Sequence, residues 1–182
     1  MFRIMAFLMA EIALCARGQT TATAATRAPN ANRTIALQTI RSADAQLMQL
    51  IDQGLLHSTT LRRLQAHLAD SPVIIYLSRV TLPRGLWGRT RIIGFGDAWR
   101  FLSVEIDDHI NVLDQLATIG HELQHATEIA DAGDVVDAGS LAALYRRIGR
   151  ESIDHDLTKD SFETDEARDA GHRVRAELSG WI

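Results

Sequence analysis

Residues 110 to 130 constrain the fold most, because their apolar side chains recur at the spacing of a long α-helix. The apolar positions are Ile110, Leu113, Leu116, Ala117, Leu123, Ala126 and Ile129. The same segment contains His121-Glu122-Leu123-Gln124-His125, with apolar residues on both sides. Since buried imidazoles need polar partners, we expect a long, mostly buried helix whose two histidines contact the same partner.

His121 and His125 lie four residues apart, so on a helix both imidazoles point the same way and can bind one metal ion. Glu122 is rotated by one residue, which puts its carboxylate beside the metal as a proton acceptor. Cys15 is the single cysteine, so histidines and carboxylates would have to hold the ion. The spacing predicts zinc, with Glu122 as general base. The alternative is an exposed polar face on a surface helix, which the apolar surroundings disfavour.

The rest of the chain alternates between helical and strand patterns. Helices are predicted at 34 to 53, 58 to 69, 140 to 148 and 162 to 178, and strands at 73 to 77, 91 to 95 and 99 to 106. Gly96-Asp97 is typical of a turn, so the last two strands should form a hairpin. Its second arm alternates between two faces, one of which would face water or a cleft. One face carries Trp99, Phe101, Ser103 and Glu105, and the other carries Arg100, Leu102, Val104 and Ile106. The predicted fold class is α+β and helix-rich, with a small mixed or antiparallel sheet.

Length and the N-terminus bear on domain organisation. With 182 residues, 46% of them hydrophobic, the chain can bury one core but hardly two, so residues 25 to 182 are predicted to form one domain. Arg3 precedes a mostly apolar run, and Ala22-Thr23-Ala24 is typical of a cleavage site. Residues 1 to 24 are therefore predicted to be the signal peptide of a periplasmic or secreted protein. Glu11 interrupts the run, and an amphipathic helix in a cytoplasmic protein is the alternative.

The charge balance limits the expected partners. The formal net charge is −4 and the basic residues are scattered, so nucleic acid is not an expected partner. The N-terminal apolar run is too short and too interrupted for a stable membrane span. Acidic residues gather late in the chain, at Asp154, Asp156, Asp160, Glu163, Asp165, Glu166 and Asp169. This cluster is either a solvated face or a feature that favours cationic substrates.

With a His-Glu-x-x-His helix placed after the strand at 99 to 106, the sequence resembles the zincin metallopeptidases. The likeness extends loosely over residues 73 to 178, and the motif is its specific part. It implies a zincin-like fold and a zinc-dependent peptidase that hydrolyses bonds in a peptide or protein substrate. It also implies that the strand at 99 to 106 lies along the cleft and pairs with extended substrates.

The third zinc ligand separates the branches of that family. The metzincin pattern needs a glycine and a third histidine soon after the motif, and residues 126 to 131 contain neither. In the gluzincin pattern a glutamate on a later helix completes the site, which here implies Glu163. That pattern has Asn before the glutamate and Ser-Asp after it, whereas Phe162 and Glu166-Ala167 stand in those places.

Other side chains remain open as the third ligand. Glu128 is the nearest rival on the motif helix. Because it lies a further turn along, it is better placed to hydrogen-bond a ligand histidine or an arginine. The remaining alternatives are Glu166, Asp165, His155 and Asp156. Glu163 could also complement the dipole at the start of the last helix, which is compatible with metal binding. The implied site is gluzincin-like, with zinc on His121, His125 and Glu163.

A few further side chains are weaker candidates. Tyr145 and His155 lie where related enzymes place an oxyanion donor, although a core tyrosine and a surface histidine are favoured. Asp114 is a possible orienter of the ligand histidines. His109 and His172 are predicted to be solvated.

A different class of function is a catalytically silent zincin-fold module that binds or regulates a partner and keeps zinc as a structural staple. The intact Glu122 argues against it, because such a module has no chemical need for a proton acceptor at that position. A helical interaction protein without metal is the third alternative.

Overall fold

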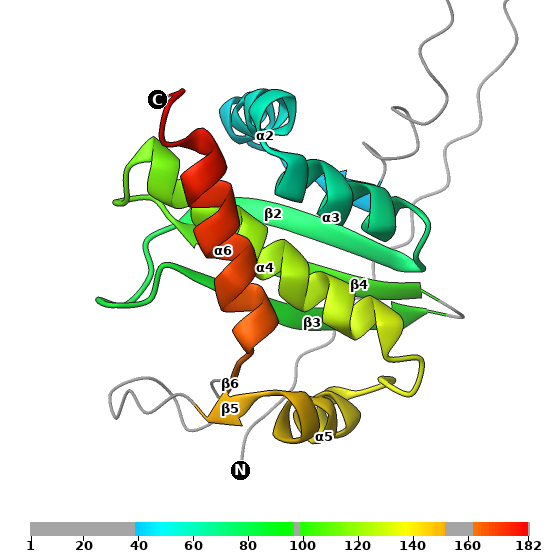
Figure 1. Ribbon diagram of the computed structural model, residues 1–182. Helices are drawn as coiled ribbons and strands as arrows, with labels where there is room; N and C mark the ends of the chain where they lie inside the picture. Colours follow the sequence, from blue (N-terminus) through cyan, green and yellow to red (C-terminus); the bar gives the residue numbers. More distant parts are fainter. Residues whose placement is uncertain (1–38, 97–98, 152–161, 182) are drawn as a thin grey trace, which may run out of the picture.

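The computed structural model describes residues 39–96, 99–151 and 162–181, so the predicted signal peptide lies outside the described residues. Its helices are α2 (Ala45–His57), α3 (Thr59–Ala69), α4 (Val112–Asp131), α5 (Ala138–Ile148) and α6 (Asp165–Leu178) (Figure 1). Its strands are β1 (Ile40–Arg41), β2 (Val73–Val80), β3 (Gly88–Gly96), β4 (Trp99–Asp107), β5 (Arg150–Glu151) and β6 (Phe162–Glu163). The fold is mixed α+β and helix-rich, as predicted. None of the described helices is long and apolar enough to cross a membrane.

The main sheet has the strand order β1-β2-β4-β3. β1, β2 and β4 run parallel, and β3 runs antiparallel to β4 at the edge of the sheet. The predicted hairpin is confirmed, with Ile92 opposite Leu102. The expectation that residues 99 to 106 form the open edge is wrong, because β4 pairs with β2 on one side and with β3 on the other. Alternating apolar residues reveal the two faces of a strand but not its neighbours.

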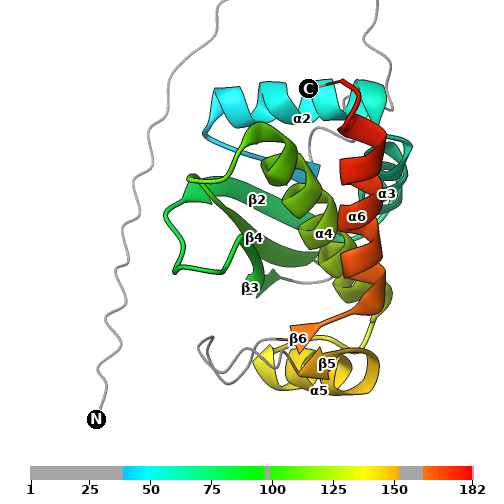
Figure 2. The ribbon, with the colours of Figure 1, turned by 60° about the vertical axis from the view of Figure 1, so that its left-hand side comes forward.

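The buried face of the sheet carries the core. In β4 the side chains of Leu102, Val104 and Ile106 are fully buried, whereas Trp99 is 47% exposed, as the alternation predicts. Helices α3, α4 and α6 lie on this side, and α4 contacts both the sheet and α6 (Figures 1 and 2). Their core residues include Leu61, Leu64, Leu68, Leu116, Ile119, Leu123, Ala170, Val174 and Leu178. The motif helix is therefore packed on two sides.

Polar contacts hold α4 at both ends. Asn111 caps its N-terminus by accepting a hydrogen bond from the N–H of Asp114 at 2.9 Å. At the other end the buried Arg100 guanidinium of β4 donates to the carbonyl oxygens of Ile129 and Ala130. A cation there complements the negative end of the helix dipole. These contacts fix the motif helix relative to the sheet.

The first predicted helix begins later than expected. Ile40–Arg41 pair in parallel with β2, and Asp44 caps α2 by accepting a hydrogen bond from the N–H of Leu47 at 3.0 Å. Among the described residues, the helical pattern predicted from residue 34 is therefore wrong at residues 40 to 44. Pairing with a distant strand overrides the local apolar spacing there.

The last predicted helix also begins later. Phe162–Glu163 form β6, which pairs with β5, and Thr164 caps α6 by accepting a hydrogen bond from the backbone N–H three residues on at 3.1 Å. The prediction that Glu163 lies on the helix is therefore wrong. The acidic residues of the first helical turn are Asp165 and Glu166.

Candidate metal centre

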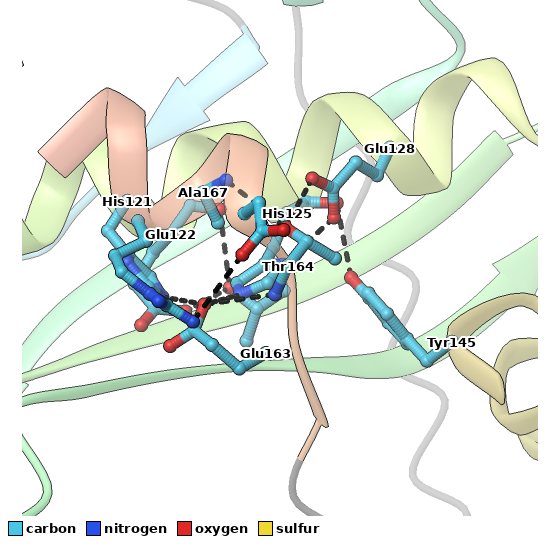
Figure 3. Close-up of polar contacts among 11 residues, drawn as sticks. His121, Glu122, His125, Glu128, Tyr145, Glu163, Thr164 and Ala167 are labelled. Atoms are coloured by element: carbon cyan, nitrogen blue, oxygen red, sulfur yellow. Dashed lines mark hydrogen bonds and ion pairs between the residues drawn. The ribbon is translucent and has the colours of Figure 1, made fainter. Parts of the chain in front are cut away.

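Three side chains from two distant parts of the chain converge. His121 and His125 come from α4, and Glu163 comes from β6, just before α6 (Figure 3). Glu163 Oε1 lies 3.4 Å from His121 Nε2 and 3.8 Å from His125 Nε2. One possible ligand atom from each of the three residues lies within 4.8 Å of the others.

The donor types fit zinc, and the two separations that involve Glu163 come close to zinc geometry. With bonds of about 2.0 to 2.2 Å, tetrahedral zinc ligands lie about 3.3 to 3.6 Å apart. The two distances to Glu163, 3.4 and 3.8 Å, are close to that range. Two imidazoles and one carboxylate are also a donor set of catalytic zinc sites, in which the fourth position stays open.

Burial keeps His121 in the form that binds metal. Desolvation is the main reason that the pKa of His121 falls from 6.5 to about 3, and the positive charges of His125, Arg168 and His172 lower it further. The imidazole is therefore neutral near pH 7, with a lone pair on one ring nitrogen. Gly171 of α6 permits close packing behind it, since a Cβ at position 171 would lie 3.3 Å from His121 Cβ.

A carboxylate orients the second histidine. His125 Nδ1 lies 2.9 Å from Glu128 Oε2, and because an ionised carboxylate only accepts, Nδ1 carries the hydrogen. In the neutral imidazole, Nε2 then keeps its lone pair on the side of Glu163. Burial lowers the pKa of His125, but Glu128, Glu122 and Glu163 together outweigh burial and raise it. The predicted contact between Glu128 and a motif histidine is confirmed, and a metal would compete with a proton at His125.

The same carboxylate also reaches the other side of the cluster. Thr164 Oγ1 donates to Glu128 Oε1 at 2.7 Å, and the N–H of Thr164 donates to Glu163 Oε1 at 3.0 Å (Figure 3). Thr164 is 1% exposed and caps α6. Glu128 therefore links His125 to the residue that follows Glu163, so the two halves of the cluster are held by one side chain.

Glu128→Gln is expected to weaken zinc binding by about 10- to 100-fold, because the amide removes a negative charge and can accept only one of the two hydrogen bonds. Competition with a chromophoric chelator measures the affinity. Glu166→Gln, the same chemical change at an exposed position of α6, is the matched control and should leave the affinity unchanged. Equal affinities for the wild-type chain and Glu128→Gln would mean that His125 needs no carboxylate to hold it.

Glu122 is buried between α4 and β3. Only 4% of its surface is exposed, and burial is the main reason that its pKa is raised. The charges of Glu163 and Glu128 raise the pKa further, whereas His125 and Thr90 lower it. Thr90 Oγ1 donates to Glu122 Oε2 at 2.7 Å. Glu122 is thus a stronger base than a free glutamate, which suits a proton acceptor that works near neutral pH.

The other predicted third ligands do not join this cluster among the described residues. Asp165 and Glu166 are exposed on α6 and do not belong to the group around His121. His155 and Asp156 lie outside the described residues, as do Asp154 and Asp160 of the predicted acidic cluster. Glu128 is occupied by the two hydrogen bonds described above.

Tyr145 belongs to the core beside the cluster. It is 8% exposed, and its ring meets the His125 ring edge-on with centroids 5.5 Å apart. Its hydroxyl lies 3.5 Å from the backbone oxygen of His125. The favoured interpretation, a core tyrosine, is confirmed.

The remaining polar candidates lie elsewhere. Asp114 accepts hydrogen bonds from Arg175 and Asn111, so the prediction that it orients a ligand histidine is wrong. His109 and His172 are exposed, as predicted. His172 still acts on the cluster at a distance, since its charge lowers the pKa of His121.

Sequence reasoning missed three residues that shape the cluster: Gly88, Thr90 and Thr164. Thr164 had a local signal, because threonine before a helical run is typical of an N-cap. Thr90 had none, since it lies 32 positions before Glu122 and reaches it through the hairpin. A Cβ at Gly88 would lie 2.6 Å from Glu122 Oε1, which only the folded structure reveals.

Comparisons with protein-family models, with curated proteins and with solved structures find no match for the chain. The geometry around α4 and β6 is therefore the ground on which a function can be assigned.

Proposed function

We propose that this chain is a zinc-dependent peptidase with a zincin-like fold. His121, His125 and Glu163 would hold the metal, and Glu122 would act as general base. The observation that carries the proposal is the convergence of three ligand atoms within 4.8 Å beside a separate buried carboxylate. Structural zinc needs no such extra carboxylate, whereas hydrolysis needs a proton acceptor.

The chain's own residues can serve each stage of hydrolysis. Zinc bound to this donor set supplies Lewis acidity, which makes a water acidic near neutral pH and polarises a carbonyl group. Glu122 takes up the proton of the attacking water and can return it to the leaving amine. Its raised pKa helps the first transfer, because a more basic carboxylate takes up a proton more readily than a free glutamate does.

The open edge of β3 supports an extended peptide as substrate. Asp107 N–H donates to the Trp87 carbonyl at 2.8 Å, so these two opposite residues form a hydrogen-bonded pair. Along an antiparallel ladder, hydrogen-bonded pairs alternate with pairs whose peptide groups point outward. The peptide groups of Gly88, Thr90 and Ile92 then point away from β4. Among the described residues no strand pairs with that side of β3. A substrate strand could add there, beside the Glu122 carboxylate.

Zinc content and peptide cleavage, measured on the full chain, test the proposal. We expect one tightly held zinc per chain by elemental analysis and cleavage of a quenched-fluorescence peptide pool. His121→Ala and His125→Ala should lose both. Folded protein without zinc would contradict the proposal, and tightly bound zinc without any cleavage would favour the silent binding module instead.

A further inference from the structure

Strand β3 touches the general base at two positions. Thr90 Oγ1 donates to Glu122 Oε2 at 2.7 Å and lies 3.4 Å from the Glu122 backbone oxygen. Two residues earlier, a Cβ at Gly88 would lie 2.6 Å from Glu122 Oε1 and 2.5 Å from Thr118 Cγ2. The carboxylate therefore lies against the strand backbone at one oxygen and is hydrogen-bonded by the strand at the other.

Thr90 is the side chain that donates to this carboxylate among the described residues. A glutamate on a helix can otherwise adopt several rotamers, and a misplaced base loses much of its effect on rate. A hydroxyl donor fixes one carboxylate oxygen without adding charge. The other oxygen keeps lone pairs that can accept a proton.

The backbone of Thr90 faces a different way from its hydroxyl. The hydrogen bond between Asp107 and Trp87 makes residues 87, 89 and 91 the ones whose peptide groups bond to β4. The N–H and C=O of Thr90 then face the open edge, while its side chain faces α4. One residue thus contacts the base and lines the place where a substrate strand could add.

We propose that Thr90 is the positioning residue that aims the general base at a peptide paired with the edge of β3. This inference rests on the proposed function. Thr90 takes no proton itself and acts through Glu122. The glycine at position 88 allows this arrangement, because any side chain there would occupy the space of the carboxylate.

Thr90→Val tests the role, because valine keeps the shape of threonine and lacks the hydroxyl. We expect kcat for a peptide substrate to fall about 10- to 100-fold while KM changes little and zinc content stays the same. Thr90→Ser, which keeps the hydroxyl, should keep most of the wild-type kcat. Thr81→Val, the same change in the exposed loop before β3, is the matched control. An unchanged kcat in Thr90→Val, or equal losses in the Val and Ser variants, would overturn the proposal.

A second readout does not depend on activity. In crystal structures of the metal-free wild-type chain, Glu122 should occupy one conformer held by Thr90, and in Thr90→Val it should shift or take several. A Glu122 side chain that stays in place in Thr90→Val would overturn the proposal, even if the wild-type chain binds zinc and cleaves peptides. Absence of zinc binding by the wild-type chain would instead count against the proposed function alone.

Discussion

Glu122→Gln is expected to lower kcat for peptide hydrolysis by about 10²- to 10⁴-fold while the chain keeps its zinc. Glutamine has nearly the same shape, so it can still occupy the space beside Gly88 and accept a hydrogen bond from Thr90. Its amide oxygen cannot take up a proton as a carboxylate does. Because Glu122 does not belong to the group of ligand atoms, the metal should stay bound.

Elemental analysis and a quenched-fluorescence peptide assay on the same preparations separate the two effects. Glu166→Gln removes a carboxylate from an exposed position of α6 and should leave both readouts unchanged. Retention of most activity in Glu122→Gln would mean that another group accepts the proton. Loss of zinc together with activity would mean that Glu122 holds the metal rather than the proton.

Much of the fold could be predicted from periodicity. The long helix α4 and the hairpin of β3 and β4 follow from apolar spacing, which depends on nearby residues alone. The position of β4 in the interior of the sheet could not be predicted, because it depends on pairing with β2, which lies earlier in the chain. The helical pattern predicted at Ile40 and Arg41 failed for the same reason, since these residues form β1 and pair with β2.

The candidate site likewise has residues whose arrangement follows from local sequence and residues whose arrangement depends on distant contacts. His121, Glu122 and His125 share one helix, so their mutual arrangement follows from the helix geometry alone. Glu163 was found by resemblance, yet its place on β6 depends on pairing with β5. Thr90 could not be predicted at all, because its contact with Glu122 requires the hairpin and α4 to pack together.

The cluster is held by the core rather than by a loop. Glu128 joins His125 to Thr164, and Thr164 caps α6, which packs against α4. On the opposite side β3 supports Glu122 through Thr90. Helix, strand and cap therefore hold the proposed ligands in place in the absence of a metal. Preorganisation of this kind reduces the cost of ordering side chains on binding.

Glu163→Ala is expected to weaken zinc binding by more than about 100-fold, because only two histidine ligands remain. Loss of a residue that only hydrogen-bonds a ligand costs less, roughly 10- to 100-fold. In the metal-free chain the change should cost little stability. Burial raises the pKa of Glu163, so above the ordinary pKa of glutamate its ionised form opposes folding, and its removal relieves that penalty.

Thermal unfolding with and without zinc separates these two effects for Glu163→Ala. The wild-type chain should gain stability on adding zinc, and each tenfold loss of affinity should remove about 1.4 kcal/mol of that gain. In excess chelator the variant should unfold at the wild-type temperature or above it near pH 7. Asp165→Ala, a neighbouring exposed acid outside the ligand group, is the control and should keep the full zinc-dependent gain. If Glu163→Ala kept that gain as well, the third ligand would lie elsewhere, and the glutamate would have only a structural place beside the histidines.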